Sequence, residues 1–318
     1  MDTITIEVEG SISNPYCLNK LKRTTDEFEQ TTFKGYLGKM LVISSSLKTV
    51  ITGSIPKHLQ GNNIHPLKYA EIIDGVMSLG KQLGIDIRKG TIRRLDISTV
   101  INVPDVVKSY FIHLAYAPKK KRTEFINSLY FISSTKISFY DKIKEMKSKS
   151  DTIPINYRSG HWMRIEVTIK ALFIRKWSEK NLNEYLTVSD LMTPEIYIKL
   201  INECQKQVAS IVWDDIVTCN EDQITSIKEL KDYLIVKGIE QSGGMAKVLS
   251  LIDEFKYKNK SWGPVQRSRC KAGFKELCSK YQTNIEASIK EKHFYDTLNE
   301  AYHWMREDVN KNHLSSFQ

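Results

Sequence analysis

Apolar and polar positions alternate through much of the first half of the chain, which predicts strands of a half-buried sheet. The alternation covers residues 1–12 and 30–53. It returns at residues 92–98 and again at 163–169. Strands mix here with helical segments over long connections, so we expect an α+β fold with a mainly antiparallel sheet.

The same alternation indicates which side chains share a face of the sheet. In residues 92–98, Arg94 and Asp96 fall together on the polar face. In residues 163–169, Arg164 and Glu166 do the same. The two segments therefore each bring one acid and one arginine to a polar sheet face.

Helical spacing dominates the remainder of the sequence. Apolar positions three and four apart predict a helix over residues 67–83, and Pro104 is expected to open another that ends near Ala115. Residues 53–58, which contain one glycine and one proline, are expected to form a turn. We therefore expect a catalytic domain at residues 1–175 and an all-helical region at 176–318, with later helices near 223–236, 243–256, 264–281 and 283–306.

A predicted β-hairpin at the centre of the first domain carries the candidate chemistry. Residues 129–132 and 136–140 are rich in β-branched and aromatic side chains, and small polar residues separate them. The second strand is expected to run on into Asp141, Lys142 and Glu145. A tyrosine and a carboxylate-bearing strand within one hairpin suit phosphodiester chemistry.

The net charge of +10 points to a polyanionic partner, and all of it belongs to residues 1–175, which hold 27 basic and 16 acidic side chains. Two basic clusters, one beside the hairpin and one near residues 256–280, are candidates for DNA binding. Solvated lysine-rich surfaces are the alternative for either cluster. The candidate DNA-binding residues are Lys119, Lys120, Lys121, Arg122, Lys256, Lys258, Lys260, Arg267, Arg269 and Lys271.

Three acids on predicted strands form a candidate metal site: Asp96, Glu145 (with Asp141 as substitute) and Glu166. Carboxylate oxygens are preferred by Mg²⁺ and Mn²⁺, which we expect as cofactors. Ion pairing with Arg94 and Arg164 is the alternative use of these acids. The sequence has no His-x-His pair and no phosphate-binding glycine loop, so a two-histidine metal site and an intrinsic ATPase are not indicated.

Tyr130 is the candidate nucleophile, and Tyr140 is the second choice. A phenol ionises near pH 10, so it needs a cation or a metal beside it to react near neutrality. Lys142 or Lys144 could provide that cation. A tyrosine that merely packs its ring in the strand is the plain alternative.

Taken in order, these segments resemble rolling-circle replication initiators of the filamentous-phage gene II/X type and the Rep-trans initiators of small plasmids. The resemblance covers roughly residues 35–170. The residues that carry it are G-S-I-P-K at 53–57, R-L-D-I at 94–97, L-Y-F at 129–131, Y-D-K at 140–142 with Glu145, and R-I-E at 164–166.

The resemblance implies a metal-dependent nickase and ligase acting on one strand of origin DNA through a 5′-phosphotyrosine intermediate. It assigns Tyr130 as nucleophile, Lys142 as its helper near the phosphate, and Asp96, Glu145 and Glu166 as metal ligands. Origin DNA, double- and single-stranded, would be the partner. Host helicase and replication machinery and a second copy of the chain are further candidates.

Two alternatives stay open. A DNA-binding regulator without catalysis would use its strand acids only to pair with arginines, and a water-using nuclease would not need Tyr130. No stretch comes near the roughly twenty apolar residues of a membrane span, so we expect no membrane partner and a location in the bacterial cytoplasm.

Overall fold

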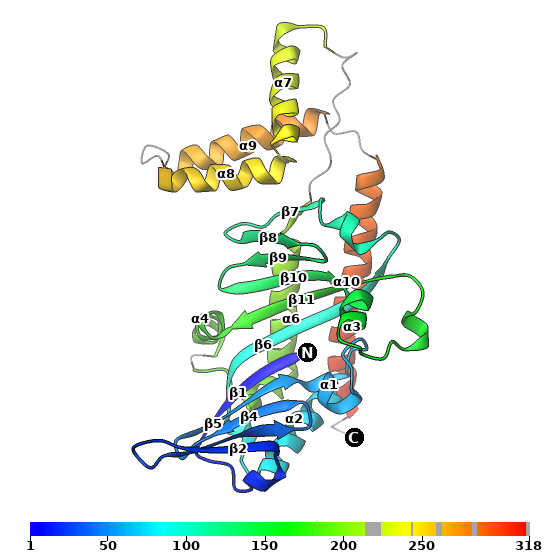
Figure 1. Ribbon diagram of the computed structural model, residues 1–318. Helices are drawn as coiled ribbons and strands as arrows, with labels where there is room; N and C mark the ends of the chain where they lie inside the picture. Colours follow the sequence, from blue (N-terminus) through cyan, green and yellow to red (C-terminus); the bar gives the residue numbers. More distant parts are fainter. Residues whose placement is uncertain (183, 214–223, 243, 259–262, 282–284, 316–318) are drawn as a thin grey trace.

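A ten-stranded antiparallel sheet forms the body of the computed structural model (Figure 1). The structure describes residues 1–318 except 183, 214–223, 243, 259–262, 282–284 and 316–318. Strand order across the sheet is β2-β3-β4-β5-β1-β6-β11-β10-β9-β8. The α+β class with its helices mostly in the C-terminal half is therefore confirmed.

The strands are β1 (Thr3–Glu9), β2 (Asn19–Thr25), β3 (Thr31–Leu37), β4 (Met40–Ser44), β5 (Lys48–Ser54), β6 (Thr91–Val103), β7 (Leu114–Tyr116), β8 (Lys121–Phe125), β9 (Ser128–Ile132), β10 (Thr135–Asp141), β11 (His161–Lys170) and β12 (Val212–Trp213). The α-helices are α1 (Ile55–Gln60), α2 (Tyr69–Leu83), α3 (Lys142–Ser148), α4 (Ala171–Asn181), α5 (Val188–Leu191), α6 (Pro194–Ala209), α7 (Ile227–Gln241), α8 (Gly244–Lys258), α9 (Pro264–Tyr281) and α10 (Ile285–Ser315).

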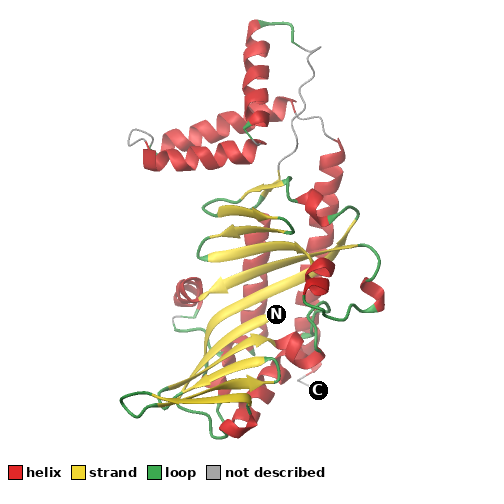
Figure 2. Ribbon diagram, viewed as in Figure 1, coloured by secondary structure: helices red, strands yellow, loops and turns green. Residues whose placement is uncertain are grey.

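One face of the sheet is apolar and is covered by helices. Leu95 and Ile97 of β6, like Ile165 and Val167 of β11, are buried in a single core. Helices α2, α6 and α10 pack on this side, and Figure 2 shows α6 and α10 running behind the strands. The opposite face therefore receives the polar side chains, as the alternation predicts.

The main core continues beyond the predicted boundary at residue 175. Phe294, Leu298 and Tyr302 of α10 belong to the same apolar cluster as the sheet. A second cluster joins helices α7, α8 and α9, where Val236, Leu249 and neighbours pack together. The chain thus leaves the main core after Trp213 and returns to it with α10.

Three local predictions were wrong. Residues 55–60 form helix α1 instead of a turn, because Ser54 caps the helix through the Lys57 amide and Pro56 fits its first turn. After Pro104 there is only a short 3₁₀ turn, and strand β7 follows. Strands β2 and β8, both at sheet edges, were not predicted.

A small polar cluster links the α7–α9 unit to strand β7. The hydroxyl of Tyr116 donates to Asp253 at 2.7 Å, and Lys271 donates to that hydroxyl at 3.0 Å. Lys271 also pairs with Asp253. Among the described residues, no helix is long and apolar enough to cross a membrane.

Candidate functional site

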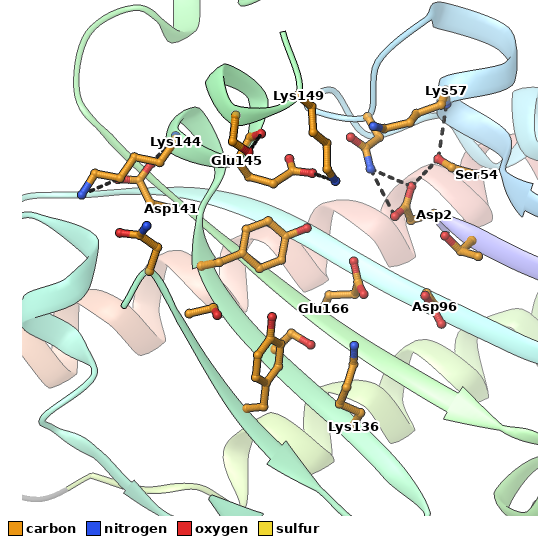
Figure 3. Close-up of a pocket in the computed structure, with 18 of the residues that line it drawn as sticks. Asp2, Ser54, Lys57, Asp96, Lys136, Asp141, Lys144, Glu145, Lys149 and Glu166 are labelled. Atoms are coloured by element: carbon orange, nitrogen blue, oxygen red, sulfur yellow. Dashed lines mark hydrogen bonds and ion pairs between the residues drawn. The ribbon is translucent and has the colours of Figure 1, made fainter. Parts of the chain in front are cut away.

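A cavity of about 540 Å³ opens on the polar face of the sheet. Strands β1, β5, β6, β9, β10 and β11 contribute to its lining, and helices α1 and α3 border it (Figure 3). Its lining includes Asp2, Ser54, Lys57, Asn63, Arg94, Asp96, Tyr130, Lys136, Ser138, Tyr140, Asp141, Lys144, Glu145, Lys149 and Glu166.

Strand register sets Tyr130 and Glu166 in one row across the sheet. Tyr130 of β9 lies opposite Ser138 of β10, and Ser138 lies opposite Glu166 of β11. The next residue in the row is Ser98 of β6. Asp96 lies two positions along β6 and faces Thr168. The nucleophile candidate and two predicted ligands therefore share one sheet surface.

Asp96 is buried and bound by Arg94. The guanidinium donates to both carboxylate oxygens, at 2.9 and 2.6 Å. Burial raises the pKa of Asp96 even though Arg94 acts in the opposite direction. The Arg94 side chain is itself 42% exposed, so it can move away from the carboxylate without leaving solvent.

Glu166 is the least satisfied acid of the group. Its nearest cation is Arg164, at 3.6 Å. Burial raises the pKa of Glu166, and the nearby charges of Asp96 and Asp2 add to that effect. Arg164 lowers the pKa of Glu166 only in part, so the effect of burial prevails.

Asp2 is a site residue that sequence reasoning missed. Its backbone amide bonds to the carbonyl of Asp96 at 2.7 Å, which places the two residues side by side. Its carboxylate receives Arg164 at 2.7 Å and hydrogen bonds from Ser54 and Asn63. Burial opposes ionisation of Asp2, but these partners outweigh it and lower its pKa. Arg164 thus joins Asp2 to Glu166.

Contrary to the sequence prediction, Glu145 and Lys142 do not lie on a strand. Both belong to helix α3, which Asp141 caps, so Glu145 is not on a strand. Lys142 is fully buried and donates to Glu145 at 2.6 Å and to Asn63 at 2.7 Å. Burial lowers the pKa of Lys142. Its ammonium ties α3 to the segment between α1 and α2 that carries Asn63, and Lys142 does not line the cavity.

The carboxylate of Glu145 is already paired on both oxygens. Lys149 contacts one oxygen (Figure 3), and Lys142 contacts the other. Burial opposes ionisation, but these hydrogen bonds outweigh it and lower the pKa of Glu145. Asp141, the substitute, is used as the cap of α3 and lies 3.9 Å from Lys144. Neither acid resembles the underpaired Glu166.

Tyr130 lies half-buried at the cavity, and Lys136 is its cation. The Lys136 ammonium is 5.3 Å from the centre of the Tyr130 ring. Lys136 is two residues before Ser138 on the same face of β10 and also acts on Glu166 electrostatically. By contrast, burial raises the pKa of Tyr140 far above its ordinary value, which opposes its use as a nucleophile.

Those of the predicted DNA-binding residues whose side chains the structure describes do not line the cavity. Lys119 and Lys121 are exposed, whereas Lys120 bonds to Ser133 and Thr135. Arg122 donates to the carbonyls of Leu114 and Phe111 and pairs with Glu124. In the second cluster Arg269 is exposed, Arg267 is half-buried, and Lys271 bonds to Tyr116. Lys260 and the side chains of Lys256 and Lys258 lie outside the described residues.

The residues present fit a divalent cation only as a pair of carboxylates. No three histidine, cysteine or acidic side chains in the described part of the chain are grouped closely enough to hold a metal ion. Mg²⁺ is commonly held by one or two protein carboxylates together with substrate phosphates. Asp96 and Glu166 meet that requirement once Arg94 moves aside, because both carboxylates line the same cavity on neighbouring strands.

Comparison with known proteins adds nothing to this geometry. No family model matches the sequence, and no curated protein matches it.

Proposed function

We propose that this chain nicks and rejoins one DNA strand through a covalent bond to Tyr130, as a rolling-circle replication initiator does. The observation that carries the proposal is the row from Tyr130 to Glu166, with Lys136 beside the phenol. A candidate tyrosine nucleophile, a neighbouring cation and two buried carboxylates share one open cavity. These are the groups that transesterification at a phosphate requires.

In the proposed reaction the Tyr130 oxygen attacks the scissile phosphorus and the bond from phosphorus to the 3′ oxygen breaks. The phenol proton passes to solvent in the open cavity, and the departing 3′ oxygen takes a proton from water. The product is a 5′-phosphotyrosine and a free 3′-hydroxyl. Rejoining reverses these steps without ATP, because the phosphotyrosine keeps the energy of the broken phosphodiester.

Lys136 is placed to favour this chemistry. Its ammonium stabilises a phenolate at Tyr130 and the negative charge that develops on the phosphate. Lys142 cannot take that role without breaking its buried bonds to Glu145 and Asn63.

Asp96 and Glu166 would hold the Mg²⁺ or Mn²⁺ ion. When bound, such an ion polarises the phosphate and neutralises charge in the transition state. Arg94 is exposed enough to leave Asp96 and pair with a phosphate oxygen instead. The α7–α9 unit, with its separate core, is the proposed reader of duplex origin DNA. A bacterial cytoplasm and association with host replication proteins belong to the same proposal.

One observation favours a second candidate, a DNA-binding regulator without catalysis. Arg94 binds Asp96 through two hydrogen bonds, and Arg164 lies between Asp2 and Glu166. The same ion pairs would be present in a protein whose strand acids serve only to neutralise arginines.

A cleavage assay separates these candidates. The substrate is a supercoiled plasmid that carries the DNA flanking the gene, incubated with Mg²⁺ or Mn²⁺. We expect relaxed circles with protein attached, and mass spectrometry of the adduct should identify the peptide that contains Tyr130. Tyr130→Phe should abolish the product, whereas Tyr16→Phe, at a fully exposed distant tyrosine, should not.

Intact DNA with a mobility shift in both forms would favour the regulator. Cleavage without an adduct, unaffected by Tyr130→Phe, would favour a nuclease that uses water.

A further inference from the structure

The turn between β8 and β9 exposes two large apolar side chains beside the cavity. Phe125 is 57% exposed and Ile126 is 78% exposed. The two residues that follow, Asn127 and Ser128, line the cavity. Together they form a small apolar surface at the edge of a polar cavity, where a ligand in the cavity can contact it.

Phe125 is held on the same side of the sheet as the candidate nucleophile. Phe125 lies opposite Ser128 in the hairpin, and Tyr130 lies two residues farther along β9. The two rings meet edge to face, with centroids 5.5 Å apart and an interplanar angle of 72°. This contact fixes the Phe125 ring next to the phenol and leaves more than half of the residue exposed.

The positive charge near Phe125 indicates which kind of ligand would contact its ring. Lys136 and Lys144 line the cavity together with Tyr130. Exposed aromatic rings beside cations are the usual recognition elements for single-stranded nucleic acid, in which bases stack on the rings and phosphates meet the cations. Paired bases are stacked within the duplex and do not offer a free face to a side chain.

We propose that Phe125 is a stacking platform for the unpaired base next to the phosphate that Tyr130 attacks. This inference rests on the proposed function and specifies its substrate: a strand that is already single or melted at the cut. Ile126 extends the apolar surface under the base or its sugar.

The test compares two probes that differ only in their bases: a fluorescent single-stranded thymidine oligonucleotide and an abasic strand with the same number of phosphates. Fluorescence anisotropy at constant salt gives both affinities. We expect the full chain to prefer the strand with bases. Phe125→Ala should reduce that preference by roughly five- to one-hundred-fold, whereas Phe125→Trp should retain it.

Two controls make the result specific. Lys136→Ala should weaken binding of both probes alike, because it removes a phosphate contact. Phe28→Ala removes an exposed aromatic ring near the opposite edge of the sheet and should change neither affinity.

Equal binding of the two probes by the wild type, binding of neither, or an unchanged preference in Phe125→Ala would overturn the proposal. Failure of the nicking function gives a different pattern. If the base preference depends on Phe125 but the protein forms no Tyr130 adduct, the stacking role of Phe125 is supported and the proposed covalent reaction is rejected.

Discussion

The ammonium of Lys136 lies 5.3 Å from the centre of the Tyr130 ring. This pairing crosses from β10 to β9 on the polar face of the sheet, and both side chains line the cavity. The sequence suggested Lys142 or Lys144 for this role, six or more residues farther along the chain. Ser138 is the residue directly opposite Tyr130 in the hairpin, and Lys136 lies only two positions before it on the same strand.

Lys136→Ala should slow formation of the Tyr130 adduct by about 100-fold, the usual effect of removing one group that stabilises transition-state charge. Lys136→Arg should retain most of the rate. The measurement is the single-turnover rate of adduct formation on a plasmid substrate. A rate unchanged in Lys136→Ala would remove this residue from the mechanism.

Lys142→Met provides the comparison. It should lower the free energy of unfolding, because Glu145 and Asn63 lose a buried partner. Its effect on the adduct rate at a temperature where the variant is folded should be smaller than that of Lys136→Ala. If Lys142→Met slowed adduct formation more than Lys136→Ala does, Lys142 would be the cation that assists Tyr130, as the sequence suggested.

Glu166 should make the protein less stable as the pH rises. Burial raises its pKa above the ordinary value of 4.5, so the folded protein binds this proton more tightly than the unfolded chain does. Ionisation above the raised pKa therefore costs the folded state free energy, and that cost is absent below about pH 4.5.

Accordingly, Glu166→Gln should be more stable than the wild type at pH 7 to 8 without metal. The difference should shrink as the pH falls through the raised pKa. Urea denaturation across this range measures it. A Glu166→Gln variant that is less stable than the wild type at pH 7 to 8 would mean that the Arg164 contact dominates Glu166.

Mn²⁺ should stabilise the wild type against unfolding, by about 2.7 kcal/mol at a concentration of about 100 Kd. Glu166→Gln should lose this stabilisation because it removes one of the two proposed ligands. Glu145→Gln should keep it, since that carboxylate is occupied by Lys142 and Lys149. Thermal melts with and without EDTA give the answer. Loss of the shift in both variants would favour the ligand set of three acids that the sequence predicts.

Arg164→Met should destabilise the fold by about 3–5 kcal/mol, because it leaves the buried carboxylate of Asp2 without its cation. Combining it with Asp2→Asn should recover a large part of the loss. A double-mutant cycle by urea unfolding measures this coupling. Strictly additive effects would show that Asp2 and Arg164 stabilise the sheet independently.

Local alternation was sufficient to predict the faces of β6 and β11. It correctly put Asp96 and Glu166 on one polar surface, because side chains on a strand alternate regardless of what the strand pairs with. It failed at Glu145, where Asp141 ends the strand by capping a helix. An aspartate followed by lysines and an acid in the next turn is a helix start, and that signal was available.

Asp2 could not be found from local pattern. Its neighbours at the site, Asp96 and Arg164, are distant in sequence and meet it only because β1 lies between β5 and β6. Lys136 was missed for a related reason, since its distance from Tyr130 depends on the register of the hairpin. Residues whose role depends on strand order require the fold before they can be identified.

Helices α7, α8 and α9 pack around an apolar cluster of their own, and the chain on either side of them returns to the sheet. Selection can therefore exchange or remodel this unit without repacking the surface that bears Tyr130. If the unit selects the DNA sequence, new target sites can evolve while the bond-breaking machinery stays the same.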